Sequence, residues 1–314
     1  MAVNETRRLE AELLEARAGE ALAAHAPARV LTITRRGLTP ADWIVGGYLV
    51  FSTVVMLIHP HSIAKLPMLL ALRGALGGFL VLCAAGRLPR RLAWIQDWYP
   101  VLLAPLFYSE AGLINRAFTD GYFDLHVEEW EASLFGGQPS VTLRDRLSGT
   151  WFSEYVHLAY FSYYFLAPAM ALFLYLRGRM RDFQVYMATV TTTFMTCLAI
   201  FIMFPVAGPY YIFTPPDPRS MGPLIPPMVH WLLRHGSSIG TAFPSSHVAV
   251  SVTVLLMAWR FSRIAFVLLL MFVPALAVGA VYGGFHYAID TLAGLVLAVL
   301  VCRIVPERVK SRLA

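Results

Sequence analysis

The chain alternates between long apolar runs and short polar segments over most of its length. Most of the runs approach the roughly 20 residues that an α-helix needs to cross the hydrocarbon core of a membrane. The eight runs cover residues 43–58, 66–85, 98–114, 157–176, 183–204, 246–259, 263–281 and 286–305. Because lipid offers no hydrogen-bond partner to a backbone amide, each run is predicted to be a helix. The pattern therefore predicts an all-α, polytopic membrane helix bundle.

Two longer segments separate some of these runs. Residues 115–156 contain Phe123, Val127, Trp130 and Leu134 at helical spacing, with acidic residues off that face. We interpret this stretch as a helix lying in the membrane interface; a soluble lid is the alternative. Residues 205–245 are rich in proline and glycine, and a loop of this length in a compact domain is usually functional.

Composition and charge support the membrane interpretation. Hydrophobic residues make up 58% of the 314 residues and charged residues 14%, against about 25% charged in an average soluble domain. The net charge of +6 would suit nucleic acid, but 18 of the 25 Lys and Arg residues fall on one side if the predicted helices alternate in direction. Excess Lys and Arg mark the cytoplasmic side. We therefore expect cytoplasmic N- and C-termini, a lipid bilayer as partner and no nucleic acid.

These observations divide the chain into four parts. Residues 1–41 form a cytoplasmic segment, in which the spacing of Leu9, Leu13 and Ala16 predicts a short helix. Residues 42–97 supply two accessory transmembrane helices. Residues 98–305 form a six-helix catalytic domain, and residues 306–314 form a cytoplasmic tail.

The first candidate site lies where the proline-rich segment meets the sixth run. The residues Phe243-Pro-Ser-Ser-His247 precede an apolar periodic stretch, which predicts a helix N-terminus at this point. Amides at a helix N-terminus lack intrahelical partners and carry partial positive charge, so they bind phosphate readily. We expect Ser245 and Ser246 to cap the helix and contact phosphate, with His247 beside it.

The second candidate site lies at the start of the eighth run. His286 and Asp290 are four residues apart, so on a helix they share a face. An aspartate that accepts the N–H of one imidazole nitrogen leaves the other nitrogen free to attack. The predicted topology places His247 and His286 at the same, extracytoplasmic face. A metal site built from His247, His286 and Asp290 is the alternative interpretation, since these are zinc ligand types.

The two histidine motifs, in this order and in a membrane setting, resemble the type-2 phosphatidic acid phosphatase superfamily. The surrounding sequence is similar to its inositol phosphorylceramide synthase (aureobasidin-resistance) branch and to bacterial relatives of that branch. This similarity spans roughly residues 98–305 and rests on Leu134-Phe-Gly-Gly-Gln-Pro-Ser140, His157-Leu-Ala-Tyr160-Phe-Ser-Tyr-Tyr164 and Phe204-Pro-Val-Ala-Gly-Pro209. The resemblance implies a location in a bacterial inner membrane.

The resemblance also implies roles for the site residues and no cofactor or metal. His286 would attack phosphorus and form a phosphohistidine, Asp290 would orient it, and His247 would protonate the leaving oxygen and then activate the acceptor. The Lys and Arg-Pro motif of the phosphatase branch is not found, because Lys65 and Arg73 are eight residues apart and glycine follows Arg73. The outer-side candidates for the phosphate clamp are Arg116, Arg219 and Arg234. The substrate-binding candidates are Tyr210, His157, Tyr160 and Glu110.

Three functions follow from these expectations. The branch resemblance favours an enzyme that takes a membrane phospholipid as donor and transfers an inositol-phosphate-like head group to a lipid hydroxyl. With water as acceptor, the same chemistry gives a lipid phosphate phosphatase. The alternative of another class is a non-catalytic lipid-binding or transport protein, for which His286 would be dispensable.

Overall fold

The computed structural model describes residues 37–313, apart from residues 64, 148 and 216. The helix expected around Leu9 to Ala16 lies outside the described residues. Within them the chain is helical and contains no β-strand, apart from one isolated bridge between Val206 and Thr241. Six helices are long and apolar enough to cross a membrane, which confirms the predicted all-α, multi-pass bundle.

Long helices form the bundle and short ones connect them. The six candidate spans lie in α2 (Pro40–Ile58), α3 (Leu66–Ala84), α8 (Thr150–Leu176), α9 (Met180–Met203), α14 (Arg263–Tyr282) and α15 (Ala288–Leu313). A shorter apolar helix, α13, covers Ser246–Phe261. The remaining α-helices are α4 (Ala93–Leu102), α5 (Ala104–Ile114), α6 (Asp124–Phe135), α7 (Pro139–Arg146), α10 (Pro209–Ile212), α11 (Pro218–Met221) and α12 (Ile225–Gly236). Two 3₁₀ turns cover Pro60–Ser62 and Arg90–Leu92.

The third apolar run is not one helix, as the sequence pattern predicted, but two. Helix α4 ends at Leu102 and α5 begins at Ala104, with Leu103 between them. Pro105 stands in the first turn of α5. Proline has no N–H and its ring clashes with the carbonyl four residues earlier, so it favours a helix start, although Pro168 and Pro274 lie inside the longer α8 and α14. The break lines one wall of the cavity described below.

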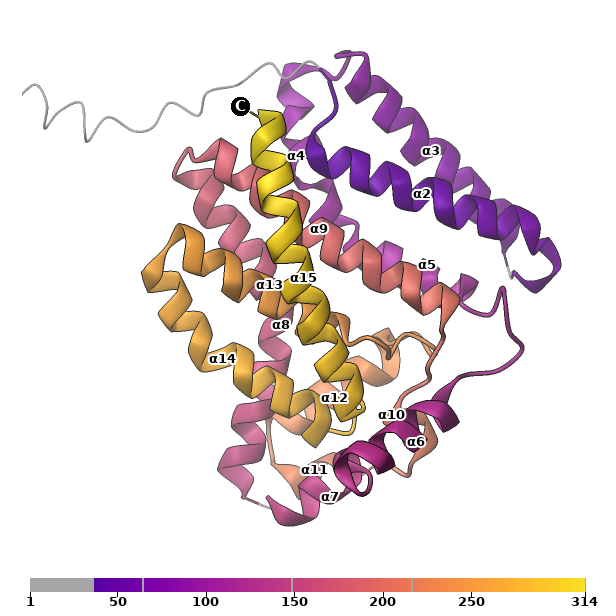
Figure 1. The fold of residues 1–314 in the computed structure, drawn as a ribbon, viewed down its shortest axis with the longest axis vertical. Helices are drawn as coiled ribbons and strands as arrows, with labels where there is room; N and C mark the ends of the chain where they lie inside the picture. Colours follow the sequence, from indigo (N-terminus) through magenta and orange to yellow (C-terminus); the bar gives the residue numbers. More distant parts are fainter. Residues whose placement is uncertain (1–36, 64, 148, 216, 314) are drawn as a thin grey trace, which may run out of the picture.

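Helix α9 is the centre of the bundle. It packs against α2, α5, α8, α13 and α15, and its apolar stretch is the most buried of the six candidate spans. Helices α13, α14 and α15 pack on one another, and α13 and α14 also pack on α8 (Figure 1), while α2 and α3 lie on the other side of α9. The short helices α6, α7, α10, α11 and α12 gather at the end of the bundle opposite the C-terminus (Figure 1).

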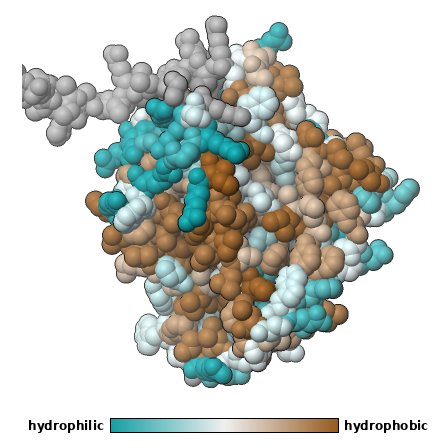
Figure 2. Space-filling view, viewed as in Figure 1, coloured by the Kyte–Doolittle hydropathy of each residue, from teal (hydrophilic) through white to brown (hydrophobic). Residues whose placement is uncertain are grey.

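Basic residues concentrate at the C-terminal end of the bundle. Arg179 bonds the carbonyl of Phe261 at 2.8 Å, and Arg260 pairs with Glu307, so these contacts join the α8–α9 turn, the α13–α14 turn and α15. On the face shown in Figure 2, apolar side chains cover the middle and hydrophilic ones lie toward the margins. This distribution is that of a protein whose middle zone contacts lipid.

Helix α6 forms as predicted, but it is turned differently from a surface helix with a buried apolar stripe. Trp130 and Leu134 are 43% and 60% exposed, whereas the acidic Asp124 and Glu131 are buried. Of the apolar face, Val127 is fully buried. The carboxylates face the protein because they accept hydrogen bonds from two loops of the candidate site.

Gly294 allows α13 and α15 to approach closely. A Cβ at this position would lie 2.6 Å from the carbonyl oxygen of Ser245 and 3.2 Å from the amide of Ala249. Both are backbone atoms of the first turn of α13 and cannot move independently. Gly294→Ala is therefore expected to cost about 1–3 kcal/mol of stability, typical of overpacking, measured as a lower unfolding temperature in detergent.

The matched control is Gly78→Ala on α3, where an added Cβ meets nothing within 4 Å. Alanine is the better helix former by roughly 1 kcal/mol, so this variant is expected to be neutral or stabilised. Equal unfolding temperatures for the two variants would show that the α13–α15 contact is looser than described.

Candidate functional site

The first turn of α13 carries His247. Ser245 is the N-cap residue, and its hydroxyl accepts a hydrogen bond from the Val248 amide at 3.4 Å. Ser245 and Ser246 are both buried, as expected for residues that hold a helix start inside the protein. The free amides and the dipole of this helix end favour a bound anion next to His247.

His286 is held from one side of its ring. Its Nδ1 lies 3.1 Å from the carbonyl oxygen of Ala242 and 3.5 Å from Oδ2 of Asp290. A carbonyl oxygen can only accept, so Nδ1 carries the proton and Nε2 keeps a free lone pair. Asp290 is itself held, because its Oδ2 accepts a hydrogen bond from the Tyr287 amide at 2.9 Å. The predicted pair is formed, with a backbone carbonyl as an additional acceptor.

The two histidines meet across the α13–α15 contact. Nε2 of His286 lies 3.3 Å from Nδ1 of His247, and the Ser245 amide donates to the carbonyl oxygen of Asp290 at 3.0 Å. The structure thus brings together all three residues expected to carry the chemistry. A lone pair on one imidazole and a proton-carrying nitrogen on another, both beside a helix N-terminus, can attack phosphorus and protonate a leaving oxygen. The 3.3 Å gap must widen to admit a phosphoryl group.

The loop before α10 supports this arrangement. The Ala242 amide donates to the carbonyl oxygen of Val206 at 3.0 Å, next to the Val206–Thr241 bridge. Gly208 has φ +94°, and its Cα packs so closely that an added Cβ would lie 3.0 Å from Cβ of Ala242. The Phe204–Pro209 segment therefore supports the extended segment that presents the Ala242 carbonyl to His286.

Three carboxylates on α6 bind the loops that flank His286. Asp124 accepts from the amides of Ala207 and Gly208, both at 2.8 Å, and from the Tyr287 hydroxyl at 3.0 Å. Glu128 also accepts from the Tyr287 hydroxyl, at 3.3 Å. These contacts were not predicted from the sequence. Spacing of i and i+4 could have placed the two carboxylates on one face, but nothing in the sequence shows what they face.

Glu131, on the same face of α6, accepts from the first amides of α15. Its Oε1 bonds the amides of Ala288 and Ile289. Burial is the main reason that the pKa of Glu131 is raised to about 7. The hydrogen bonds from the two amides oppose this rise, and the nearby charges of Asp290 and Glu128 add to it. The folded protein therefore holds the proton of Glu131 more tightly than the unfolded chain does.

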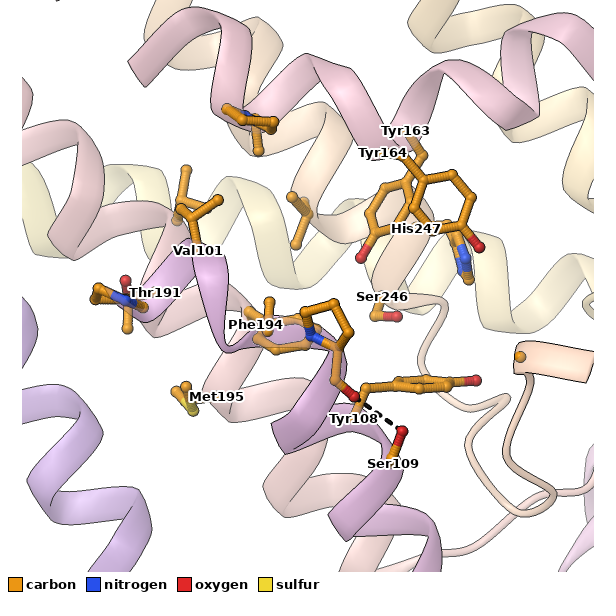
Figure 3. A pocket seen from close by; sticks show the side chains of 18 of the residues that line it. Val101, Tyr108, Ser109, Tyr163, Tyr164, Thr191, Phe194, Met195, Ser246 and His247 are labelled. Carbon is orange, nitrogen blue, oxygen red and sulfur yellow. Dashed lines mark hydrogen bonds between the residues drawn. The ribbon is translucent and has the colours of Figure 1, made fainter. Parts of the chain in front are cut away.

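An apolar cavity of about 220 Å³ ends at His247. It lies between the α4–α5 break, α8, α9, α12 and α13. In Figure 3, Tyr163 and Tyr164 lie beside His247, and Phe194 and Met195 lie farther along the cavity. The lining is mainly aliphatic and aromatic, so the cavity suits hydrocarbon.

The residues expected to bind substrate fall in three places. Tyr160 stacks on the His247 ring, with centroids 4.9 Å apart. His157 is buried beside His230, and Tyr210 contacts the His230 ring at 5.9 Å between centroids. Glu110 is outside the cavity lining and forms a buried ion pair with Arg73 at 2.7 Å.

The three arginines proposed as phosphate clamps, Arg116, Arg219 and Arg234, are all exposed, and none lines the cavity. The structure brings a different arginine close to the site. Arg144 on α7 lines a small pocket with Gly283 and Gly284, immediately before His286. Its sequence context gave no signal, since it lies outside both histidine motifs.

In the described part of the chain, no group of three or more His, Cys, Asp or Glu residues is arranged to hold a metal ion. His247, His286 and Asp290 instead form a line in which each contacts the next.

Comparison with known proteins matches the region that contains this site to one protein family. No curated protein and no solved structure matches the chain significantly. A family model described as PAP2 superfamily matches residues 127–304, which is more than half of the chain and includes His247, His286 and Asp290. Such membership indicates a phosphatase-type enzyme acting on lipid phosphoesters, and it does not single out the inositol phosphorylceramide synthase branch. With both histidine motifs inside the matched region, the chain belongs to the PAP2 superfamily.

Proposed function

We propose that the protein is a membrane phosphotransferase that forms a phosphohistidine on His286. Nε2 of His286 attacks phosphorus, the bond from phosphorus to the lipid oxygen breaks, and His247 gives that oxygen a proton. In the second step His247 takes the proton of an acceptor hydroxyl, whose oxygen attacks phosphorus and breaks the P–N bond. The two steps balance and leave both histidines as they began.

The hydrogen bonds of His286 support its role as nucleophile. Its Nδ1 is occupied by Ala242 and Asp290, and its Nε2 points at His247. Asp290 stabilises the positive charge that the ring acquires when it attacks. Amides at the start of α13, near Ser245 and Ser246, stabilise the charge on the phosphoryl oxygens. This scheme needs no cofactor or metal.

The observation that carries the proposal is the position of His247. One side of its ring faces His286, and the residue also lines the apolar cavity. Leaving group and acceptor both meet His247, one after the other, so both approach it through or beside an apolar space. A lipid hydroxyl fits this route better than a small polar molecule. We therefore propose transfer of an inositol-phosphate-like head group from a membrane phospholipid to a lipid acceptor.

The superfamily match also supports a second candidate function, that of a lipid phosphate phosphatase with water as acceptor. The histidine chemistry is identical, and only the acceptor differs. In either case we propose that the site lies on the extracytoplasmic side of a bacterial inner membrane with both termini in the cytoplasm, because Lys and Arg concentrate at the opposite end.

Product analysis distinguishes these functions. Purified protein in mixed micelles is incubated with phosphatidylinositol labelled in its head group, with and without ceramide or diacylglycerol. A transferase moves label to the added lipid and releases the donor's backbone. A phosphatase instead releases inorganic phosphate from phosphatidic acid and ignores the added lipid. Failure to turn over any phospholipid or lipid phosphate would disprove the enzyme proposal.

A further inference from the structure

A polar cluster lies beside the Gly283–Phe285 turn that precedes His286, outside the lining of the apolar cavity. It consists of Ser140 and Arg144 on α7, His157 on α8 and His230 on α12. Ser140, His157 and His230 are each at most 1% exposed. None of the four lines the apolar cavity. The cluster is therefore separate from the apolar surface that suits lipid chains.

Five side-chain atoms of this cluster are buried without a hydrogen-bond partner. They are Oγ of Ser140, Nη1 of Arg144, Nε2 of His157, and both Nδ1 and Nε2 of His230. A buried polar atom left unpaired costs about 1–3 kcal/mol, so such atoms are rare and call for a ligand or water. Of the described arginines, Arg73 and Arg144 have buried, unpaired guanidinium nitrogens, and Arg73 is already ion-paired with Glu110.

Contacts join the cluster to the turn before His286. Ser140 and Arg144 line a pocket with Tyr210 and the Gly283–Gly284 turn. The Phe285 ring lies 5.0 Å from the His230 ring and 5.7 Å from the His157 ring, measured between centroids. The cluster is thus joined to His286 through the Gly283–Phe285 turn, whereas the apolar cavity is joined to it through His247.

The unpaired atoms include acceptors as well as donors. Nδ1 of His157 donates to the Ser153 carbonyl at 2.7 Å, so the neutral ring presents a bare acceptor at Nε2. Burial lowers the pKa of His230 to about 3, and the charges of Arg144 and Arg234 contribute. His230 is therefore neutral, with one donor and one acceptor. An anion can accept a hydrogen bond from Arg144, but it cannot donate one to the bare nitrogen of an imidazole. That nitrogen requires a donor such as a hydroxyl.

A single water in the pocket beside Ser140 and Arg144 does not account for the whole set, because His157 and His230 do not line that pocket. The pocket beside Ser140 and Arg144 has a volume of about 10 Å³, which is room for roughly one water molecule. One water makes at most about four hydrogen bonds. A ligand larger than water must displace part of the pocket lining, which includes Tyr210 on the four-residue helix α10.

We propose that Ser140, Arg144, His157 and His230 form a subsite for a hydroxyl-bearing head group that remains on phosphorus during the reaction. Arg144 pairs with a non-bridging oxygen of the phosphate diester, and His157 and His230 bind hydroxyls of the head group. The inference rests on the proposed phosphohistidine chemistry and narrows its substrate to diesters with polyol head groups.

The test compares two diesters that differ in hydroxyl groups, phosphatidylinositol and phosphatidylethanol, with phosphatidic acid as the monoester. Wild-type protein is expected to prefer phosphatidylinositol over phosphatidylethanol in kcat/KM by at least about 10-fold. His230→Leu is expected to remove this preference through KM, while His230→Gln, which keeps a donor and an acceptor, retains part of it. Arg144→Gln lowers kcat/KM for both diesters, and Arg146→Gln, exposed on the same helix, changes neither.

Unfolding temperatures in detergent check that each variant is folded. If His230→Leu does not fold, the preference for phosphatidylinositol is measured in Ser140→Ala and His230→Gln instead. Equal loss on phosphatidylinositol and phosphatidylethanol in the His230 variants would overturn the subsite and leave the enzyme proposal standing. Turnover of phosphatidic acid alone would overturn both the subsite and the transferase and leave the phosphatase candidate standing. No turnover of any of the three lipids would overturn both.

Discussion

Replacing His286 with alanine is expected to abolish lipid turnover, with a loss of more than about 10³-fold in kcat. The side chain supplies the attacking Nε2, and no other nucleophile faces His247 in the described site. The measurement is product formation from labelled lipid by purified protein, with a covalent phosphohistidine sought in the acid-quenched wild type. His247→Ala is expected to lose activity to a similar degree, because the leaving oxygen then departs without a proton.

The matched control is His235→Ala. His235 is exposed, and its Nδ1 bonds the Trp231 carbonyl of its own helix, so its loss is expected to leave activity unchanged. Activity that survives in His286→Ala at the level of His235→Ala would contradict the nucleophile assignment. It would favour the non-catalytic lipid-binding or transport protein.

Asp290→Asn is expected to reduce kcat less, by roughly 10- to 100-fold, whereas an isolated orienting aspartate costs about 10⁴-fold. The reason lies in the two acceptors of His286 Nδ1. Ala242 oxygen at 3.1 Å is closer than Asp290 at 3.5 Å, and it fixes the same tautomer after the substitution. What the variant loses is the negative charge that balances the imidazolium.

Asp124→Ala is expected to lower both stability and activity, although Asp124 contacts no reacting atom. Its two oxygens accept from the amides of Ala207 and Gly208 and from the Tyr287 hydroxyl. Removing the carboxylate leaves the buried amides of Ala207 and Gly208 unpaired, at about 1–3 kcal/mol each, and leaves the Tyr287 hydroxyl with Glu128 alone. The donors belong to the segments on either side of His286, so both should shift. We expect a lower unfolding temperature and at least a roughly 10-fold fall in kcat.

Glu129→Ala removes the same charge from an exposed position of α6 and is the matched control. It should leave both the unfolding temperature and kcat unchanged. A positioning role also predicts that Asp124→Ala changes kcat more than KM, because the substrate-binding surfaces are untouched. An Asp124→Ala protein with wild-type unfolding temperature and kcat would show that the hydrogen bonds of Asp124 do not position the segments around His286.

Much of the fold could be predicted from the sequence because lipid imposes a simple rule. Each apolar run had to be a helix, and the runs are long enough to be distinguished. The prediction was wrong at residues 98–114, where Pro105 breaks the third run. It also missed helix α12. This helix lies within the proline-rich segment, and its polar residues interrupt the apolar pattern that would have marked it as a helix.

The orientation of α6 could not be predicted in the same way. The spacing of Val127, Trp130 and Leu134 correctly indicated an amphipathic helix, yet the acidic side is the one that packs on the protein. A carboxylate is buried only where hydrogen-bond donors or positive charges compensate for its loss of water. Those donors are backbone amides more than 80 residues away, at Ala207 and Gly208 and beside His286, and amides carry no signature in the sequence.

The sequence by itself determined the helical membrane fold and the pairing of His286 with Asp290, because both rest on local spacing and on residue type. The predicted topology added His247 at the same face. Only the tertiary structure decided which groups surround that pair. The Ala242 carbonyl on His286, the apolar cavity at His247, the α6 carboxylates and the cluster around Arg144 all join segments distant along the chain. Such contacts depend on how helices cross, and that is set by packing at positions such as Gly294 rather than by any local pattern.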